Sequence, residues 1–518
     1  MNLDLTVPLQ LTIALGPDLI LIVGASILLI WAAWRPDSNA HQRAVGVASL
    51  VVAVLTLAAC IFYIGRYTTT NTGPIAVDNF RWMADIVILI GTIFAIALAM
   101  DDNERSGIPV AESHVLLLFA SSGMMLLASA RDLMIVFLGI ELMSISVYAL
   151  AGINRRSVRS AEGALKYFLL GAFSTAFLLY GIALIYGATA TTDIGLIGSR
   201  IVSLGIAHGG LLAIGIALLL IGFGFKVATV PFHMWAPDVY DGSPSAITAY
   251  MAATVKAAAF FAFLRVWLEA FPSVFESWYP VVAGLAIATM IVGNAIGLAQ
   301  KNLKRMLAYS SIGHAGYLLV TLASGTTAGA SAMLFYLLVY TLATFGAFAV
   351  IITLTKPGEG TVMTDDLAGL WSVRPWLALA MGVLMLALLG FPFFGGAGFL
   401  AKWYVLESAL DAPTPLTTLV VVLAITTAVS AGYYLYVVKM IFMEPRGERG
   451  PVPAGAGSLT RFVLVVTVLA ILVLGVAPDL VVRATRQYGR PQMNALPASA
   501  AGADAPITVG AGSSSLVR

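Results

Sequence analysis

Seven side chains that can gain or lose a proton lie in or beside long apolar runs of this sequence. They are Glu141, Lys166, Lys226, His233, Lys256, His314 and Lys402. A lysine at the centre of a membrane helix costs about 2.5–3.5 kcal/mol on insertion scales, so such residues are rare and usually face a bundle interior with a partner. The chemistry that these residue types share is proton transfer.

A buried amine beside a carboxylate makes a switchable proton site. Free lysine titrates near pH 10.4, and in general burial and a nearby carboxylate shift a lysine's pKa in opposite directions. Movement of Glu141 toward or away from Lys226 would therefore switch the amine between holding and releasing a proton. The hypothesis requires the two helices that carry them to be adjacent, and a structural ion pair is the alternative for Glu141.

Simpler roles exist for other residues of this kind. Lys166 lies only a few residues into its apolar run, so its amine could extend to the membrane interface. His233 and His314 could each be helix-packing residues with satisfied hydrogen bonds. Arg265 and Glu269, one helical turn apart, are interpreted as a local surface pair.

The elements that must hold these residues are membrane helices. The 518 residues are 60% hydrophobic and 10% charged, with a mean hydropathy of +0.94, whereas an ordinary soluble domain is about 25% charged. A spanning segment needs about 20 mostly apolar residues and must satisfy its own backbone hydrogen bonds. The composition predicts an all-α polytopic membrane protein in a lipid bilayer.

Apolar runs between polar breaks predict about fourteen transmembrane helices. Their ranges are 11–34, 44–65, 82–100, 112–130, 132–152, 163–188, 209–231, 245–270, 278–299, 306–325, 327–355, 375–406, 415–443 and 459–482. The predicted units are three N-terminal helices (1–110), a first five-helix repeat (111–270), a second inverted repeat (271–443), a last helix (444–486) and a disordered polar tail (487–518).

Two of these helices are predicted to be discontinuous. Helix seven has Pro231 shortly after Lys226, and helix twelve contains "GFPFFGGAGFLAKW", which includes Lys402. Proline removes a backbone donor and glycine weakens a helix, so such backbone is tolerated only where it faces protein or a water-filled cavity. Interruptions at matching places in two halves indicate a transport site built from repeats.

The spacing of the titratable residues agrees with two inverted repeats. Lys226 follows Glu141 by 85 residues, and Lys402 follows His314 by 88. If helices 4–8 repeat as helices 9–13, helix five matches helix ten and helix seven matches helix twelve. An odd number of spans per repeat inverts the second repeat in the membrane. Each half would then pair one titratable residue with one lysine at a broken helix.

Basic residues in the loops predict the orientation. One set of alternate loops is rich in them: Arg35, Arg43, Arg105, Arg155, Arg156, Arg159, Lys301, Lys304, Arg305, Arg446 and Arg449. The opposite loops are poorer: Arg66, Arg81, Arg131 and Arg200. The richer set should face the cytoplasm, which places both termini outside. The N-terminus has no basic residue ahead of its apolar run, which argues against a cleaved signal peptide.

Cysteine content and net charge exclude other kinds of chemistry. The single cysteine, Cys60, cannot form a disulfide within the chain or provide a cysteine-ligated iron–sulfur or zinc site. We therefore expect no cofactor and no metal in this chain. A net charge of +2 is too small to suggest a nucleic-acid partner.

Four ordered motifs resemble a known family of membrane proteins. They are "FLGIELMSISVYAL" around Glu141, "KVATVPFHMWAPDVYDGSPSAITAYMAATVK" from Lys226 to Lys256, "KRMLAYSSIGHAGY" with His314, and "GFPFFGGAGFLAKW" with Lys402. The pattern resembles the proton-translocating membrane subunits of respiratory complex I and the related multisubunit cation/proton antiporters. The resemblance extends from about residue 10 to about residue 480.

Within this family the sequence looks most like the subunit N branch of bacterial NADH-quinone oxidoreductase. Subunit M-like members tend to carry glutamate where this chain has Lys402. Subunit L-like members extend into further spans and a long lateral helix, which the polar tail here does not supply. The family's fold also implies two inverted five-helix repeats.

The resemblance implies roles for the titratable residues in a proton relay. Glu141 and Lys226 would form the coupling pair. Lys256 and His314 would extend a central hydrophilic axis, and Lys402 would end the exit half. The complete predicted relay is Glu141, Lys166, Lys226, His233, Lys256, His314 and Lys402, of which Lys166 matches a family lysine near the pair.

The function implied by the resemblance is proton transfer from the cytoplasm to the outside of the bacterial inner (plasma) membrane. The driving reaction, NADH oxidation by quinone, would occur elsewhere in the complex, with FMN, iron–sulfur clusters and quinone in partner subunits. Subunits M, K and J are the expected neighbours. Moving one charge against 100 mV needs about 2.3 kcal/mol, comparable with a pKa change of about two units at 1.36 kcal/mol each. The chain would be an enzyme subunit without a redox centre.

Three other functions remain open from the residues. A subunit of a multisubunit sodium/proton antiporter shares the lysine motifs and needs no NADH module. A membrane subunit of a hydrogenase-linked complex is a further possibility. A passive scaffold would use the lysines only to stabilise the bundle. Two lysines at helix breaks argue against a scaffold, because a charged side chain inside the membrane is energetically costly.

Overall fold

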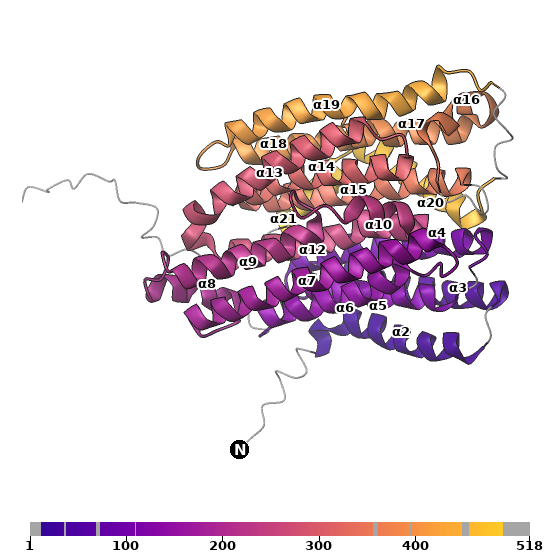
Figure 1. The fold of residues 1–518 in the computed structure, drawn as a ribbon. Helices are drawn as coiled ribbons and strands as arrows, with labels where there is room; N and C mark the ends of the chain where they lie inside the picture. The colour runs from indigo at the N-terminus through magenta and orange to yellow at the C-terminus, as the bar shows by residue number, and fades with distance from the viewer. Residues whose placement is uncertain are drawn as a thin grey trace, which may run out of the picture.

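The structure, a computed structural model, describes residues 12–35, 38–68, 73–108, 110–355, 361–393, 396–447 and 455–489. Within these ranges the chain forms helices and three isolated β-bridges, but no β-strand. Figure 1 shows the long helices running side by side in one bundle. The predicted all-α fold is therefore confirmed.

The number of membrane-crossing segments agrees with the sequence prediction. The helical elements are α2 (Gly16–Trp34), α3 (Asn39–Tyr63), α4 (Asn79–Arg105), α5 (Glu112–Ala128), α6 (Leu133–Ala151), α7 (Val158–Thr189), α8 (Ile194–Ser203), α9 (Gly210–Val227), α10 (Ala236–Gly242), α11 (Ser245–Tyr250), a π-helical turn (Met251–Val255), α12 (Lys256–Ala270), a 3₁₀ turn (Pro272–Val274), α13 (Phe275–Leu298), α14 (Leu303–Ala323), α15 (Thr327–Leu354), a 3₁₀ turn (Thr364–Leu367), α16 (Leu370–Val373), α17 (Pro375–Leu389), α18 (Gly396–Leu410), α19 (Thr417–Phe442), α20 (Ser458–Val476) and α21 (Asp479–Tyr488). Twelve segments of the described residues are long and apolar enough to cross a membrane. The shorter α5 and the interrupted pair of α17 and α18 complete the predicted set of about fourteen.

Polar caps define where several of the long helices begin. The side chains of Ser38, Asp78, Asp132, Ser157 and Asn302 accept hydrogen bonds from backbone N–H groups in the first turns of α3, α4, α6, α7 and α14. These N–H groups have no partner within the helix, so a capping side chain typically stabilises the helix by about 1 kcal/mol. These five apolar helices therefore begin directly after a short polar residue.

Three segments form the interior of the bundle. The segment Ser245–Ala270, which contains α11 and α12, is 100% buried over its most apolar window, and α14 and α15 are each 94% buried, against 33% for α2 and α3. Figure 1 shows α12 and α15 between the indigo and magenta N-terminal helices and the orange helices α17 to α19. Polar side chains on α12, α14 and α15 therefore face protein rather than lipid.

Both predicted helix interruptions are present. α9 ends at Val227, followed by Ala228 in the left-handed conformation at φ 58°, and the chain resumes as α10 after a non-helical turn. This break precedes Pro231, so helix seven is shorter than the predicted range 209–231. α17 ends at Leu389 and is followed by Gly390, whose φ of 80° suits glycine, and α18 begins at Gly396. The division of the chain into two inverted repeats stays a prediction.

The C-terminal part of the chain differs from the prediction. The last predicted span, 459–482, is two helices, because α20 ends at Val476 and Pro478 precedes a separate helix, α21. α21 reaches Tyr488 and so includes the first two residues of the predicted tail. The remainder of that tail, from residue 490, lies outside the described residues. The short helix α8 was also not predicted.

The interpretation of Arg265 and Glu269 as a surface pair is wrong. Arg265 is 1% exposed and Glu269 is 6% exposed, because α12 lies in the bundle interior. Arg265 donates to Glu269 Oε1 at 3.0 Å and, through both terminal nitrogens, to the two oxygens of Asp78 at 2.8 and 2.9 Å. Spacing on one helix identified a local contact but could not show its burial.

Candidate functional site

Lys226 lies in the last turn of α9, where the helix breaks, and it is 3% exposed. Its Nζ donates a hydrogen bond to Ser144 Oγ at 2.8 Å and to the Tyr148 hydroxyl at 3.2 Å. Both hydroxyls belong to α6, so the tertiary structure brings helix five of the predicted order against the break in helix seven. The amine is thus buried among hydroxyl groups that can also accept or donate protons.

Glu141 also lies on α6, three residues before Ser144 and therefore one helical turn away. It is partly buried. Among the described residues, no hydrogen bond or ion pair joins Glu141 to Lys226. The predicted pair is therefore not joined directly, and the α6 groups that contact Lys226 are the hydroxyls of Ser144 and Tyr148.

Lys166 lies on α7, at the partly exposed edge of this cluster. Its Nζ contacts Glu162 Oε1 at 2.7 Å and Asp238 Oδ2 at 2.9 Å, and Asp238 also pairs with Arg305 at 2.8 Å. The side chain of Lys166 is 42% exposed. The structure places this lysine in a peripheral ion-pair network that links α7, α10 and α14, and not beside Lys226.

His233 lies in the turn between α9 and α10. It is half-buried, and its Nδ1 is a buried atom that has no hydrogen-bond partner among the described residues. Next to it, Trp235 donates from its indole to Phe225 O at 3.1 Å and stacks on Tyr167 at a centroid distance of 4.4 Å. The aromatic contacts hold the broken segment in place and leave the imidazole nitrogen available.

Lys256 is the first residue of α12, directly after the π-helical turn, and it is 1% exposed. Its Nζ donates to the carbonyl oxygen of Ser311 at 2.8 Å and makes a short hydrogen bond to the Ser311 hydroxyl. Ser311 lies on α14, one turn before His314. The buried amine of α12 is therefore connected to the helix that carries the buried imidazole.

His314 has a hydroxyl partner on each ring nitrogen. Its Nδ1 shares a hydrogen bond of 2.5 Å with the Tyr336 hydroxyl on α15, and its Nε2 shares one of 3.0 Å with the Tyr434 hydroxyl on α19. Tyr434 in turn makes a short hydrogen bond with Ser310. An imidazole with a hydroxyl on both sides can accept a proton at one nitrogen and release one from the other.

Lys402 lies on α18, just beyond the break of helix twelve, and it is 6% exposed. Its Nζ donates to Leu389 O at 2.8 Å, a carbonyl that the end of α17 leaves free, and lies 4.9 Å from the Tyr317 ring centroid. A cavity of about 10 Å³ lies beside His314, Tyr336 and Lys402. That volume is close to the space needed for one water molecule.

A larger cavity of about 280 Å³ lies further along α18. Residues of α15, α18 and α21 line it, among them Ser331, Glu407 and Arg486, together with Asp411, which directly follows α18. Glu407 follows Lys402 by five residues, a rise of about 7.5 Å along the helix, and it pairs with Arg486 of α21 at 3.3 Å. The polar cavity is thus close to Lys402 and is bordered by a helix that was not predicted.

The sequence interpretation missed the burial of Lys304 and the hydroxyl groups that connect the lysines. The pattern of basic residues predicts Lys304 in a cytoplasmic loop, but this lysine lies in the first turn of α14 and is 2% exposed. Its Nζ donates to Ser243 O at 2.6 Å and to Asp241 O at 3.1 Å. The order of Ser311 and His314 within the "YSSIGH" motif could have indicated a polar face on that helix, whereas Tyr434 had no motif to identify it.

The predicted residues form two groups in the structure. The first contains Lys226 with its α6 hydroxyls, and Glu141 lies one turn away. The second contains Lys256, His314 and Lys402, with the connecting groups Ser311, Tyr336 and Tyr434. No group of three or more His, Cys, Asp or Glu side chains suited to a metal ion occurs within the described ranges. The chemistry that the arrangement can perform is proton transfer between buried amines, an imidazole and hydroxyls.

Comparison with known proteins gives consistent results. Residues 130–430 match the family described as "NADH:quinone oxidoreductase/Mrp antiporter, TM". The chain is 48% identical to NADH-quinone oxidoreductase subunit N of Gemmatimonas aurantiaca, over 92% of each chain. It is 43% identical to the subunit N of Trichlorobacter lovleyi, over 91% of this chain and 95% of that one.

Solved structures resemble it as well. A chain of respiratory complex I from Thermus thermophilus is 37% identical and superposes with a TM-score of 0.78, covering 92% of this chain and 100% of that one. A chain of the Mrp complex from Dietzia has the same fold at 20% identity, with a TM-score of 0.80 and coverage of 93% and 97%. This chain therefore belongs to the NADH:quinone oxidoreductase/Mrp antiporter family of membrane subunits, and within that family to the NADH-quinone oxidoreductase subunit N group.

Proposed function

We propose that this chain moves protons across a bacterial plasma membrane as a subunit of an NADH-quinone oxidoreductase. The single observation that carries the proposal is the second buried group, in which Lys256, His314 and Lys402 lie on interior or broken helices. Their polar atoms contact hydroxyls and carbonyls on neighbouring helices. A buried lysine in a membrane protein is by default a functional-site hypothesis. Here two buried lysines and a buried histidine occupy one region, and His314 and Lys402 line the same small cavity.

The proposed relay enters at the first group and leaves at the second. Glu141 and Lys226 form the coupling pair through Ser144, and His233 is available at the break between α9 and α10. Lys166 lies at the edge of this group and contributes a positive charge through its ion pair with Asp238, which also pairs with Arg305. Lys256, His314 and Lys402 then pass the proton toward the cavity of about 280 Å³ beside α21, which is the proposed exit.

The orientation follows from the basic loops. With the arginine- and lysine-rich loops in the cytoplasm, both termini are outside and the proposed exit opens on the outer face. The N-terminal ends of α4 and α15 lie at the end of the bundle opposite to Arg105, which donates to Ile352 O at the other end of α15. Since the cavity lies at the N-terminal end of α15, this arrangement supports an outward exit.

The energy for transfer comes from partner subunits in the proposed complex. FMN, iron–sulfur clusters and the quinone belong to those partners, and the single cysteine of this chain supports that division. Subunit M and the small subunits K and J are the proposed membrane neighbours. The names of the relatives, all of which match most of this chain, support the complex.

A sodium/proton antiporter subunit is the second candidate. The observation that favours it is the fold shared with the Mrp complex chain. The identity to subunit N chains is higher, at 48% against 20%, and this supports the oxidoreductase.

The test is purification of the complex through a tag on this chain, followed by reconstitution in liposomes. NADH-dependent quinone reduction with acidification of one compartment supports the proposal. Lys256→Met should then lower the number of protons moved per NADH oxidised, whereas the matched control Lys439→Met should not, because Lys439 is an exposed partner of Glu444. Sodium-dependent proton exchange without NADH oxidation would indicate an antiporter subunit. Unchanged proton pumping by the Lys256→Met complex would indicate a scaffold subunit.

A further inference from the structure

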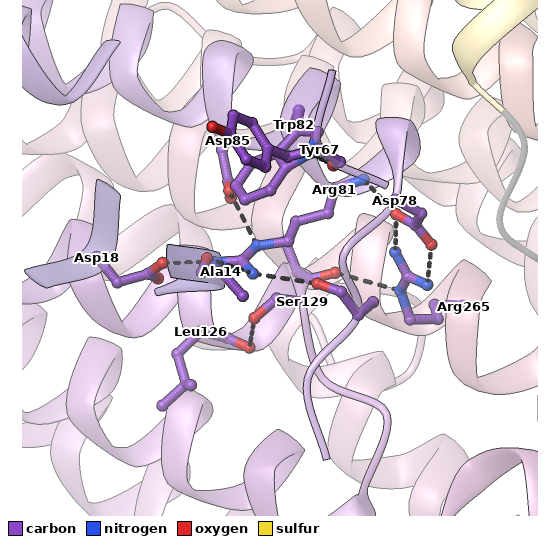
Figure 2. Close-up of polar contacts among 12 residues, drawn as sticks. Ala14, Asp18, Tyr67, Asp78, Arg81, Trp82, Asp85, Leu126, Ser129 and Arg265 are labelled. Atoms are coloured by element: carbon purple, nitrogen blue, oxygen red, sulfur yellow. Dashed lines mark hydrogen bonds and ion pairs between the residues drawn. The ribbon is translucent and has the colours of Figure 1, made fainter. Parts of the chain in front are cut away.

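A second cluster of buried charges lies at the ends of α2, α4 and α12, outside the proposed relay (Figure 2). Its buried members are Asp18, Asp78, Arg81, Asp85, Arg265 and Glu269, and the partly exposed Arg131 borders it. On α12, Arg265 lies nine residues beyond Lys256, a rise of about 13 Å. The cluster joins the N-terminal helices to the interior of the bundle.

The half of this cluster around Arg265 is electrically balanced. Arg265 binds both oxygens of Asp78 and also Glu269 Oε1, as described above. The second oxygen of Glu269 lies 3.9 Å from Arg131 Nε. Two guanidinium groups thus face two carboxylates, so no charge is left over in this half.

The half around Arg81 has one cation for two carboxyl groups. Arg81 makes a short ion pair through Nη2 with Asp18 Oδ2, and its Nε donates to Asp85 Oδ2 at 3.4 Å. Its Nη1 donates to the backbone oxygens of Ala14 and Ala76 at 3.2 and 3.1 Å. Figure 2 shows Asp18 and Asp85 approaching the same guanidinium from different helices.

Each of these two carboxyl groups keeps one buried oxygen without a partner. Asp18 Oδ1 and Asp85 Oδ1 accept no hydrogen bond from the described residues. Asp85 and Arg81 are 0% exposed and Asp18 is 4% exposed. An unpaired buried charge is strongly unfavourable, and such a group becomes neutral by taking up a proton. The two free oxygens are positions where that proton can bind.

Within the part of the chain that the structure describes, the groups that surround the pair add no compensating cation. No other lysine or arginine of the described residues forms an ion pair with Asp18 or Asp85. α3 contributes the Cys60 thiol and the Tyr63 hydroxyl, the residue after α5 contributes the Ser129 hydroxyl, and α12 contributes the balanced groups described above. Thiols and phenols are ordinarily neutral at pH 7. Among the described groups, the excess of one negative charge therefore lies on the two aspartates.

We propose that Asp18 and Asp85 share one exchangeable proton, held against Arg81, and thereby form an additional proton-binding site. With this proton the cluster is neutral, and without it one carboxylate is buried unpaired. Carboxyl groups that share a site in this way titrate in two separate steps.

The path by which this proton exchanges with water is short, because the two aspartates lie near the ends of their helices. Asp18 is the third residue of α2 and Asp85 the seventh of α4, a rise of about 9 Å from the first residue of that helix. The site lies at the end opposite to Arg105 and the other basic loops, so it loads from that face alone. It does not depend on the proposed relay and is tested separately.

The experiment is infrared difference spectroscopy on the purified complex, in which a protonated carboxyl gives a carbonyl band that shifts in D₂O. The wild type at neutral pH should show one such carboxyl that is lost in Asp85→Asn and titrates away at alkaline pH. The matched control Glu269→Gln changes a carboxylate of the balanced half and should leave the band in place. Asparagine preserves the shape of the aspartate, so the variant should still assemble.

Thermal unfolding of the same samples provides the second measurement. Because loss of the shared proton leaves a buried unpaired charge, the wild type should unfold at a lower temperature at alkaline than at neutral pH. Asp85→Asn should lose this dependence, since one carboxylate and one guanidinium remain. An unchanged band in both Asp18→Asn and Asp85→Asn would overturn the proposal. So would a band that appears only when sodium is removed, because the site would then hold a sodium ion.

Discussion

Lys256 on α12 and Ser311 on α14 are joined by two contacts, in which one buried amine binds both the carbonyl and the hydroxyl of a single serine. Lys256 makes these contacts from the start of α12, directly after the π-helical turn. Such turns occur often at functional sites. This contact connects the most buried helix of the bundle to His314, and it motivates the first prediction.

Replacement of Lys256 by methionine should abolish proton transfer through this chain. A positioned proton-transfer group typically contributes about 10²–10⁴-fold to rate, so transfer should fall by at least about 100-fold. Ser311→Ala should have a smaller effect, because the Ser311 carbonyl still binds the amine. The measurement is the number of protons moved per NADH in liposomes. Equal pumping by Lys256→Met and the wild type would exclude Lys256 from the relay.

Replacement of Lys402 by arginine should block the relay although it preserves the charge. Arginine is not deprotonated in proteins, so it can hold a positive charge but cannot release a proton. At Lys166 the same change should be tolerated, because this lysine is partly exposed and acts through ion pairs with Glu162 and Asp238. Proton pumping by the two variants is compared at equal amounts of assembled complex. Normal pumping by Lys402→Arg would show that only its charge matters.

Replacement of Arg265 by methionine should destabilise the protein by about 3–5 kcal/mol, because it leaves the carboxylate of Asp78 buried and unpaired. Burial by itself raises the pKa of Asp78, which lies before the first residue of α4, but Arg265 and the Arg81 N–H together hold that pKa below its ordinary value. Thermal unfolding of wild type and variant at neutral pH measures the difference. A loss of less than about 1 kcal/mol would mean that water replaces Arg265 at this carboxylate.

The same ion pair predicts an acid-dependent loss of stability. Since the pKa of Asp78 is lowered in the folded state, its contribution is complete above the unfolded value of about 3.9. It disappears as the pH falls below that value and through the lower folded one. Unfolding temperatures should therefore fall on acidification in this range for the wild type, and by a smaller amount for Arg265→Met. Parallel curves for the two proteins would contradict the assignment.

Replacement of Gly398 by alanine should disturb the break in helix twelve. A Cβ at this position would lie 1.8 Å from Ala387 O, so α17 and α18 would have to separate. Overpacking of this kind typically costs about 1–3 kcal/mol, and it should displace Lys402 from Leu389 O. Gly284→Ala is the control, because nothing lies within 4 Å of the added Cβ. Unfolding temperature and pumping are both measured, and normal values for Gly398→Ala would argue against a rigid break.

The sequence alone determined the membrane fold and the identity of the relay candidates. Apolar runs of about 20 residues require helices, because lipid offers no hydrogen-bond partner to the backbone. The motifs around Lys226 and Lys402 also located both helix breaks, since proline and glycine act on the local backbone. Helix ends were less certain, as α9 and α20 show, because a helix can end before its proline.

Only the tertiary structure decided which polar groups meet. The relay residues are contacted from other helices by Ser311, Tyr336 and Tyr434. Residue spacing along one helix cannot predict a contact between two helices. The sequence also could not predict the burial of Lys304 and Arg265. Charged residues of this kind usually lie at the surface, and here they are buried because neighbouring helices cover them. The ion-pair partner and the solvent exposure of a charged side chain depend on helices that are far apart in the sequence. Helix formation depends instead on residues that are close together in the sequence.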